Sequence, residues 1–269
     1  MKRCVFFAFL ACASLAFGSL SAQLVRPDSL VVVDLPGGAR LEMVHVAGGT
    51  FTMGNDEARG LKVNYDASRP EHRVTVGDFY IGRYEVTQGQ WAAVTGERPS
   101  KASGNDSLPV EQVSWEAAQR FCTLLSQMTG MRFRLPTEAE WEFAARGGAF
   151  SRNTPFAGSP AMAAAGWFCV NSEGHTHPVG RLKANELGLY DMSGNVMEWC
   201  SDWMAPYAAG EAVNPEGPSD GESRVLRGGH YNSTSPGCTV YDRAWYLPTG
   251  GYEYFGLRVV LEPIEEEQP

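Results

Sequence analysis

The sequence predicts a single α+β domain in which irregular structure is abundant, and three observations support this prediction. Alternating apolar and polar residues between residues 39 and 87 are typical of strands. Three segments between residues 87 and 148 carry the start signals of helices. Beyond residue 148, Gly, Pro and Asn divide the chain into short pieces, and the 30 glycines and 16 prolines among 269 residues imply many turns.

The predicted strands come first along the chain. "ARLEMVHVAGGTFTMG" (39–54) reads as two strands around a Gly-Gly turn, and "HRVTVGDFYIGRYEVT" (72–87) continues the alternation. Further strand candidates are "WFCV", "RVLRGG" and "FGLRVVLE" in the second half. Because a loop-rich region built on a few strands usually carries the site, we expect the site in that half.

Each predicted helix has capping residues at its start and glycine at its end. The signals are Thr87 with Gln90 and Gly96, Ser114 with Gly130, and Thr137 with Glu140 and Gly147-Gly148. The helix after Ser114 places Cys122 on its apolar face, so we predict that this cysteine is a core residue. Glu138, Glu140 and Glu142 are interpreted as first-turn acids favoured by the helix dipole.

The first 22 residues have the parts of a secretory signal peptide. Lys2 and Arg3 precede an apolar run from Val5 to Phe17, which is too short for a membrane span, and small residues end at Ala22. We therefore expect a secreted or periplasmic (cell-envelope) protein, and lipid anchoring through Cys12 stays open as an alternative. The predicted organisation is a signal peptide at 1–22, an N-terminal extension at 23–38, one domain at 39–262 and a disordered acidic tail at 263–269.

Charge and cysteine content restrict the partners and the chemistry. The net charge is −9, and removal of Lys2 and Arg3 makes it more negative by two, so an acidic chain without a basic patch argues against nucleic acid as a partner. No other stretch approaches the ~20 apolar residues of a membrane span. Cys122, Cys169, Cys200 and Cys238 remain after cleavage, and they either form disulfides in one of three pairings or stay buried.

Two further segments carry candidate ligands for metals. In "GLYDMSGNVMEWCSDW" (188–203), Asp191 and Glu198 flank a Ser-Gly-Asn turn, and two carboxylates with carbonyls between them suit Ca²⁺. The alternative is an Asx-type turn that leads into the core. His175 and His177 form an H-x-H pair, but the glycine before them and Pro178 after them favour exposed loop histidines.

Taken together, these motifs resemble the formylglycine-generating enzyme family, also called the sulfatase-modifying factor family. The resemblance covers nearly the whole mature chain, from "MVHVAGGTFTMG" through "YEVTQGQW", "PVEQVSWEAAQRFCTLLSQMTGMRFRLPTEAEWEFAARGG" and "NELGLYDMSGNVMEWCSDW" to "RVLRGGHYN" and "FGLRVV". It implies a compact, loop-rich fold related to C-type lectins. It also implies that the segment at 191–198 binds a structural Ca²⁺ through Asp191 and Glu198 and through the carbonyls of Gly194 and Val196.

The oxidase members of that family convert a sulfatase cysteine to formylglycine with O₂ and a Cu(I) ion held by two cysteines. The matching positions here, counted from Gly228, are Ser233 and Cys238, so one of the two cysteines is replaced. Two thiolates suit Cu(I), whereas a serine hydroxyl is a hard ligand with a high pKa, so we do not expect copper. If the protein is an enzyme, Cys238 is its nucleophile or metal ligand, with His230 as an alternative second ligand.

Three functions remain open from the sequence. A ligand-binding domain is favoured, because the stretch from His230 to Gly256 is rich in Tyr, Trp, Ser, Asn and Gly, which make adaptable contact surfaces for a protein or a glycan. The predicted ligand-binding residues are His230, Tyr231, Ser233, Tyr241, Trp245, Tyr246 and Tyr252. The alternatives are an oxidoreductase that acts on a sulfatase cysteine or another thiol through Cys238, and a structural component of a cell-envelope secretion machine.

Overall fold

The computed structural model describes residues 30–56 and 65–263. The predicted signal peptide (1–22) and all but the first residue of the predicted tail (263–269) lie outside these described residues. Within the described ranges, no helix has the length and apolar character needed to cross a membrane.

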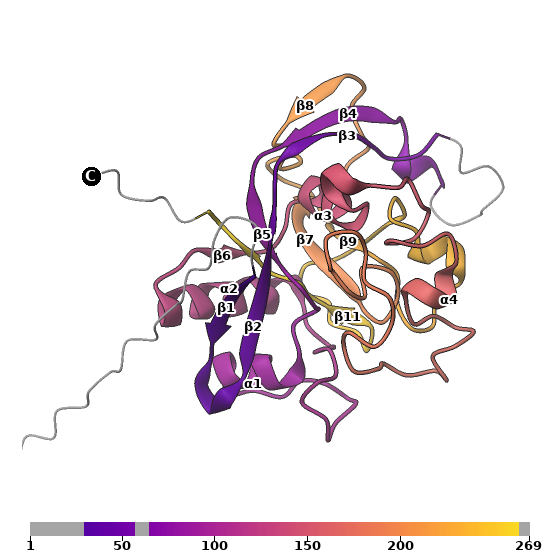
Figure 1. Ribbon diagram of the computed structural model, residues 1–269. Helices are drawn as coiled ribbons and strands as arrows, with labels where there is room; N and C mark the ends of the chain where they lie inside the picture. The colour runs from indigo at the N-terminus through magenta and orange to yellow at the C-terminus, as the bar shows by residue number, and fades with distance from the viewer. Residues whose placement is uncertain (1–29, 57–64, 264–269) are drawn as a thin grey trace, which may run out of the picture.

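The residues that the structure describes form twelve short strands and four α-helices. Both classes of element are present, as an α+β domain requires (Figure 1). The strands are β1 (Val31–Asp34), β2 (Arg40–Val46), β3 (Gly49–Met53), β4 (His72–Val76), β5 (Phe79–Gly82), β6 (Phe133–Arg134), β7 (Met197–Trp203), β8 (Glu211–Val213), β9 (Arg224–Arg227), β10 (Arg243–Tyr246), β11 (Phe255–Gly256) and β12 (Val260–Leu261). The α-helices are α1 (Gln88–Thr95), α2 (Trp115–Thr129), α3 (Glu138–Ala145) and α4 (Met162–Ala165). Single 3₁₀ turns cover Pro36–Gly38, Tyr65–Ser68, Gly148–Phe150 and Ser235–Cys238.

Three sheets organise the described chain. One has the strand order β1-β2-β5-β12-β6, a second has β10-β9-β7-β11, and a third has β3-β4-β8. The last strand, β12, lies between β5 and β6, so the C-terminal part of the chain pairs with the N-terminal part. β1 pairs with β2 through Val31 opposite Met43, and both residues are fully buried. The core therefore extends N-terminal to the predicted boundary at residue 39.

Most local predictions match the structure. The strands at 39–54 and 72–87 correspond to β2 to β5, although β2 and β3 join different sheets rather than pairing with each other. "RVLRGG" contains β9. "WFCV" is not a strand: Asn171 accepts a hydrogen bond from the Phe168 amide on its Oδ1 and returns one to the Phe168 carbonyl, so a turn replaces the expected extended backbone.

The helices begin at the predicted caps. Thr87 and Gln90 exchange both bonds of a capping box at α1, and Thr137 and Glu140 do the same at α3. Ser114 accepts the Ala117 amide at the start of α2. α3 ends at Ala145, slightly before the glycines that were expected to stop it.

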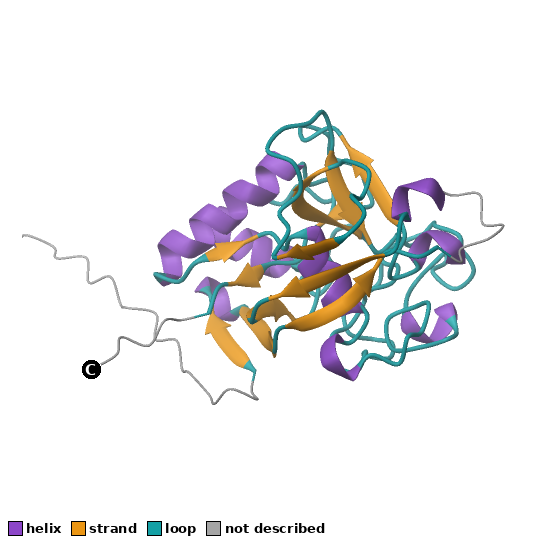
Figure 2. Cartoon of the chain, turned by 90° about the horizontal axis from the view of Figure 1, so that it is seen from above, coloured by secondary structure: helices purple, strands orange, loops and turns teal. Residues whose placement is uncertain are grey.

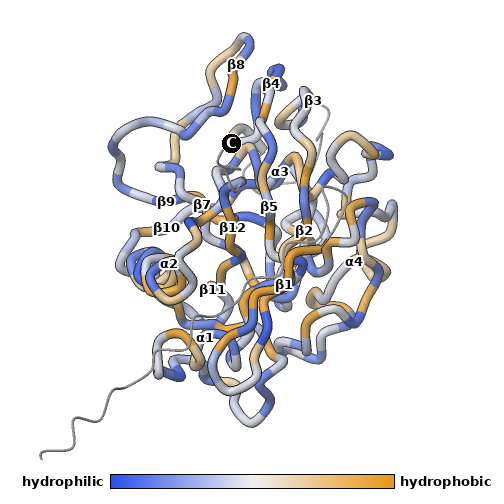
Figure 3. Tube along the Cα trace, turned by 60° about the vertical axis from the view of Figure 1, so that its left-hand side comes forward, coloured by the Kyte–Doolittle hydropathy of each residue, from blue (hydrophilic) through white to orange (hydrophobic). Residues whose placement is uncertain are grey.

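The core consists of two large clusters of buried apolar side chains. Cys122 of α2 is 2% exposed, as predicted, and the stacked rings of Trp91 and Phe121 join α1 to α2 with centroids 5.1 Å apart. Buried strands such as β1 and β12 appear as hydrophobic stretches in the trace (Figure 3). The long helix α2 covers one flank, while loops gather on the opposite flank (Figure 2).

Candidate functional site

The candidate site is built on three loops that hydrogen-bond to one another. The turn at 191–196 donates from the Gly194 amide to the Gly228 carbonyl over 2.7 Å, and its Asn195 carbonyl accepts the Tyr231 amide at 2.9 Å. The Asn195 amide in turn donates to the Trp167 carbonyl at 2.9 Å. Gly194 has φ +86°, and a Cβ there would lie 2.1 Å from the Trp167 carbonyl oxygen, so only glycine permits this close approach. The turn therefore fixes the position of the Gly228–Cys238 loop.

Ser233 and Cys238 lie next to each other inside that loop. The Ser233 Oγ accepts the His230 amide at 3.1 Å, and the Ser233 amide donates to the His230 carbonyl at 2.8 Å, which closes a tight turn. The Cys238 thiol is fully buried, and the Ser233 side chain interacts with it and lowers its pKa slightly. A Cβ on Gly229, whose φ is +71°, would lie 2.6 Å from the Cys238 sulfur, so glycine is required beside it. The two positions that match the copper ligands of the oxidases thus face each other, with one oxygen and one sulfur.

The Cys238 thiol is poorly suited to ionise. Burial, with smaller contributions from Asp242 and Cys169, raises its pKa to about 12. It packs against Met162 and Phe168 in a small apolar cluster. Cys169, which follows Phe168 in the chain, is exposed, and its amide donates to the Ser233 carbonyl at 3.0 Å. All four cysteines of the described part of the chain are free thiols.

The two side chains among the predicted calcium ligands, Asp191 and Glu198, are both buried. The Asp191 Oδ2 accepts the Gly180 amide at 2.7 Å, while its Oδ1 is buried without a hydrogen-bond donor in the described chain. Both oxygens of Glu198 accept bonds from Arg258, and Oε2 also accepts the Trp141 indole N–H at 2.6 Å. A third carboxylate, Glu85, is fully buried and accepts the Val196 amide at 3.0 Å.

These three buried carboxylates face one guanidinium. Burial raises the pKa of Asp191 to about 6, and burial together with the charges of Asp191 and Glu198 raises that of Glu85. The free Asp191 oxygen and the excess of negative charge fit a divalent cation with oxygen ligands. The engagement of Glu198 by Arg258 and Trp141 fits it less well, and in the described ranges no three His, Cys, Asp or Glu side chains form a metal-binding group.

Four of the predicted ligand-binding residues, together with one that was not predicted, form an aromatic cluster: His230, Tyr231, Tyr246, Tyr252 and Tyr254. The rings of His230 and Tyr254 stack with centroids 4.3 Å apart, and Tyr252 stacks on Tyr254 at 5.8 Å. The hydroxyls of Tyr246 and Tyr252 are 2.6 Å apart. Tyr252 is 40% exposed, which makes it the most accessible ring of the cluster.

His230 supplies a hydrogen-bond donor within the aromatic cluster. Burial lowers its pKa to about 4, so the ring is neutral at pH 7. Its Nδ1 accepts the Asn232 amide at 3.2 Å, which places the proton on Nε2. No described residue accepts a hydrogen bond from that Nε2.

The other predicted ligand-binding residues lie elsewhere. Trp245 is 40% exposed, but strand alternation in β10 places it on the face opposite Tyr246. Tyr241 packs against the core cluster that contains Trp141. His177 is only partly exposed, because it stacks on Trp167 with ring centroids 3.8 Å apart, whereas His175 is exposed as predicted.

The glutamates of α3 have a role that the sequence did not predict. Glu140 closes the capping box, but Glu138 and Glu142 are buried. Glu142 binds Arg227 at 2.5 Å and Arg146 at 2.7 Å, and Glu138 binds Arg227 and, through both oxygens, Arg243. Burial raises the pKa of Glu142, but the charges of Arg146 and Arg227 outweigh it and hold that pKa below its usual value. The helix-dipole interpretation therefore applies only to part of this segment.

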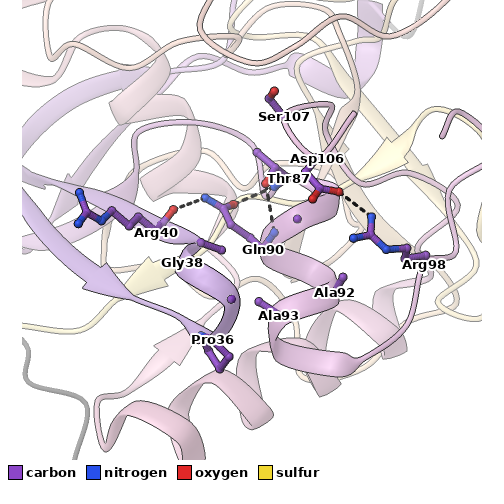
Figure 4. Close-up of a pocket in the computed structure, with 13 residues that line it drawn as sticks. Pro36, Gly38, Arg40, Thr87, Gln90, Ala92, Ala93, Arg98, Asp106 and Ser107 are labelled. Atoms are coloured by element: carbon purple, nitrogen blue, oxygen red, sulfur yellow. Dashed lines mark hydrogen bonds and ion pairs between the residues drawn. The ribbon is translucent and has the colours of Figure 1, made fainter. Parts of the chain in front are cut away.

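A hollow of about 660 Å³ lies apart from these loops, between the Pro36–Gly38 turn, β2 and α1 (Figure 4). Its cations are already paired, since Arg98 binds Asp106 at 2.7 Å and Arg40 binds Asp34 at 3.0 Å. The Gln90 side chain is engaged by the capping box and by the Arg40 carbonyl. Each charged side chain that lines this hollow is therefore already in an ion pair within the protein.

Comparison with known proteins decides the family. The model described as the sulfatase-modifying factor enzyme 1-like domain matches residues 35–263. The chain belongs to this family. The chaperone protein LppX of Paenibacillus barcinonensis is 31% identical to the chain, and the alignment covers 96% of the chain and 98% of that relative. The formylglycine-generating enzyme of Mus musculus is 30% identical, with 84% of the chain and 76% of the relative aligned.

Among solved structures, variable protein 1 of Treponema denticola is similar to this sulfatase-modifying factor family member. Its TM-score is 0.79 at 29% identity, and the match covers 86% of the chain and 98% of that protein. The likeness confirms the predicted fold class and family, including the loop-rich second half.

Proposed function

We propose that this protein is a secreted or cell-envelope member of the family that binds a protein ligand through the aromatic cluster and does not catalyse copper-dependent formylglycine synthesis. The observation that carries the proposal is the contrast between the Cys238 thiol and the aromatic cluster. Cys238 is buried, with a raised pKa and the Ser233 side chain beside it, while Tyr252, which stacks on Tyr254, is 40% exposed.

The hydrogen bonds of Ser233 support the argument against copper. Its hydroxyl already accepts the His230 amide and interacts with the Cys238 thiol. A Cu(I) site would need two soft anionic ligands, and here one ligand is a hard, neutral hydroxyl and the other is a thiol with a pKa of about 12. The second sulfur ligand of a low-coordinate copper site is therefore missing, and the remaining cysteine, Cys238, ionises only with difficulty.

The geometry of the aromatic cluster supports a binding role. Stacked tyrosines offer contact area that loses little conformational entropy on binding, and hydroxyl groups and the His230 Nε2–H add directional hydrogen bonds. The neighbouring loop contributes small polar residues such as Asn232 and Ser233. The relative from Paenibacillus barcinonensis is named a chaperone protein, a role that also requires contact with another protein.

A structural calcium ion at the 191–198 turn is part of the proposal. The Asp191 Oδ1 is the best-supported ligand because it is buried without a donor in the described chain, with the carbonyls of Gly194 and Val196 and the Glu198 carboxylate completing the set. The ion would neutralise buried negative charge and stabilise the turn that holds the Gly228–Cys238 loop. Gly194 and Asn195 would then keep the loop in place through their bonds to the Gly228 carbonyl and the Tyr231 amide.

Peptide selection tests the binding function. A phage-displayed random peptide library is selected on the folded protein, and the enriched peptides are measured against a Tyr252→Ala/Tyr254→Ala variant. Phe150, which is 69% exposed on a different part of the chain, provides a Phe150→Ala control. We expect the enriched peptides to lose about tenfold or more in affinity on the tyrosine variant and to keep it on the control. Equal binding to all three proteins would rule out the aromatic cluster as the binding site.

A further inference from the structure

The edge of the aromatic cluster carries two carboxylates, Glu111 and Glu253. Glu253 follows Tyr252 and precedes Tyr254 in the chain, and its carboxylate accepts a hydrogen bond from the Tyr231 hydroxyl. Glu111 belongs to the segment that pairs with this loop, since the Gln112 amide donates to the Tyr252 carbonyl at 2.9 Å. The pKa of Tyr231 rises to about 12 through burial and through the charges of both carboxylates, so the two acids flank one phenol.

Glu111 is buried and only partly satisfied. Glu111 is 1% exposed, and its Oε1 accepts a hydrogen bond from the Ala102 amide at 2.9 Å. Its Oε2 is buried and accepts no well-aligned hydrogen bond in residues 30–56 and 65–263, although the Lys101 backbone amide also interacts with the carboxylate and lowers its pKa. Burial raises the pKa of this carboxyl, as expected for an acid whose charge is not fully compensated. An unpaired buried acceptor of this kind indicates a missing donor.

One cation of the chain itself reaches this corner. Lys101 binds Glu253 with 2.5 Å between Nζ and Oε2, and its side chain is 70% exposed. Lys101 lies on the loop whose Ala102 amide binds Glu111. His230 is neutral at pH 7, so the two carboxylates face a single positive charge that sits at the solvent boundary.

We propose that the ligand presents a cationic side chain, an ammonium or guanidinium group of a protein, that enters beside Tyr254 and replaces Lys101 at Glu253. This inference rests on the proposed binding function and names the chemistry of its ligand. The exposed ring of Tyr252 offers an aromatic face to the cation, and Glu253 offers a charged acceptor. The negative charge of Glu111, on the other side of the Tyr231 phenol, adds electrostatic attraction.

Lys101 then acts as an internal competitor. An exposed ion pair contributes little to stability, because both partners are solvated when they are apart. Displacement of Lys101 from Glu253 by a better-placed cation therefore costs little free energy. Truncation of Lys101 should consequently strengthen binding of a cationic ligand, which general electrostatic attraction to an acidic protein would also do. The size and the site dependence of the effects separate the two explanations.

The test uses fluorescein-labelled acetyl-tetralysine amide as the probe and fluorescence polarisation as the readout. We expect Glu253→Gln to weaken binding about fivefold and Lys101→Ala to strengthen it about threefold. Glu211→Gln on β8 is the matched control, because Glu211 is also exposed, also contacts one cation (Arg73, at 3.9 Å) and changes the net charge equally. It should leave the affinity within about 1.5-fold of the parent.

Two outcomes would overturn the inference. One is an equal loss for Glu253→Gln and Glu211→Gln, which would show that only net charge matters, and the other is an unchanged affinity for both. Thermal unfolding of each variant checks that the fold is intact. Peptides that depend on Tyr252 and Tyr254 but bind Glu253→Gln normally would leave the binding function standing and remove only the assignment of the cation.

Discussion

Two groups of charged residues near the Gly228–Cys238 loop differ in how completely they are paired. Beneath the loop, Glu138 and Glu142 of α3 are buried and accept bonds from Arg227 and Arg243. Beside the loop, Glu253 is paired with an exposed lysine, and one oxygen of Glu111 has no donor in the described chain. The first group is complete within the protein, whereas the second has capacity for an external partner.

The complete group explains how the loop is held. Arg227 ends β9 directly before Gly228, and Arg243 begins β10 five residues after Cys238. Both guanidinium groups bind carboxylates of the same short helix, so α3 fixes both ends of the loop. The buried ion pairs therefore position the loop, whereas the carboxylates beside the loop can still bind an external cation.

The largest effect is expected from breaking the buried network. Glu142→Gln leaves Arg227 and Arg146 without their shared carboxylate, and loss of one partner of a buried ion pair costs about 3–5 kcal/mol. Urea denaturation should show this loss in the free energy of unfolding. Glu116→Gln, an exposed acid in the first turn of α2, should change it by less than about 0.5 kcal/mol. A loss for Glu142→Gln as small as the control's would mean that the network does not hold the loop.

A second prediction concerns Asp202, which accepts the Glu138 amide and lies in the same buried region. Burial, aided by the Glu138 charge, raises its pKa to about 7. The folded state binds this proton more tightly than the unfolded state. The stabilisation that the protonated Asp202 gives the folded state is therefore fully present below about pH 4 and is lost as pH rises through about 7. Thermal unfolding should show the parent losing about 2 kcal/mol between about pH 5.5 and about pH 7.5, and Asp202→Asn losing less. An identical pH profile for the two proteins would contradict the shift.

Calcium should give a smaller effect at the turn that supports the loop. Addition of about 1 mM Ca²⁺ to chelator-treated protein should stabilise it by about 1–2 kcal/mol, since a ligand that binds only the folded state raises its stability. Asp191→Ala should remove this response, and Asp220→Asn, an exposed acid, should preserve it. Thermal unfolding with and without the ion checks this, and an equal response of parent and Asp191→Ala would place any calcium elsewhere.

Cysteine reactivity distinguishes the buried thiol from an exposed one without changing stability. Iodoacetamide at about pH 8 should alkylate Cys169, which is exposed. Cys238 should be alkylated at least about 100-fold more slowly, because it is buried and its thiolate fraction is small. Mass spectrometry of peptides from the native protein measures both rates in one sample. Comparable rates would show that Cys238 is accessible as a thiolate, in favour of the oxidoreductase alternative.

Features set by neighbouring residues were predictable from the sequence. The caps at Thr87, Ser114 and Thr137 use contacts within four residues, so their spacing alone reveals them. The pairing of Glu138 with Arg243 spans 105 positions, and nothing local distinguishes a buried glutamate from a first-turn acid. The apolar "WFCV" segment was misassigned because the side chain of Asn171 forms the turn.

The candidate site was predictable in part for the same reason. His230, Tyr231, Tyr246 and Tyr252 were expected together because they share one aromatic stretch. Tyr254 and Glu253 lie in the same stretch but were not singled out, whereas Glu111 and Lys101 come from a loop more than 140 positions before Glu253. Tertiary contacts of that kind have no signal in a single sequence. Nothing in the sequence distinguishes Glu111, Glu186 and Asp191, each with one buried oxygen that lacks a donor in the described chain, from the other acids.

The central claim is that the pair at Ser233 and Cys238 does not form a copper site and that the loop serves binding instead. Anaerobic titration of the purified protein with Cu(I), in competition with a chelator and alongside Cys238→Ala, tests it most directly. The account predicts that parent and variant bind Cu(I) equally weakly, because one hard oxygen cannot complete a two-sulfur site. Tight binding of one ion per chain that disappears in Cys238→Ala would contradict it.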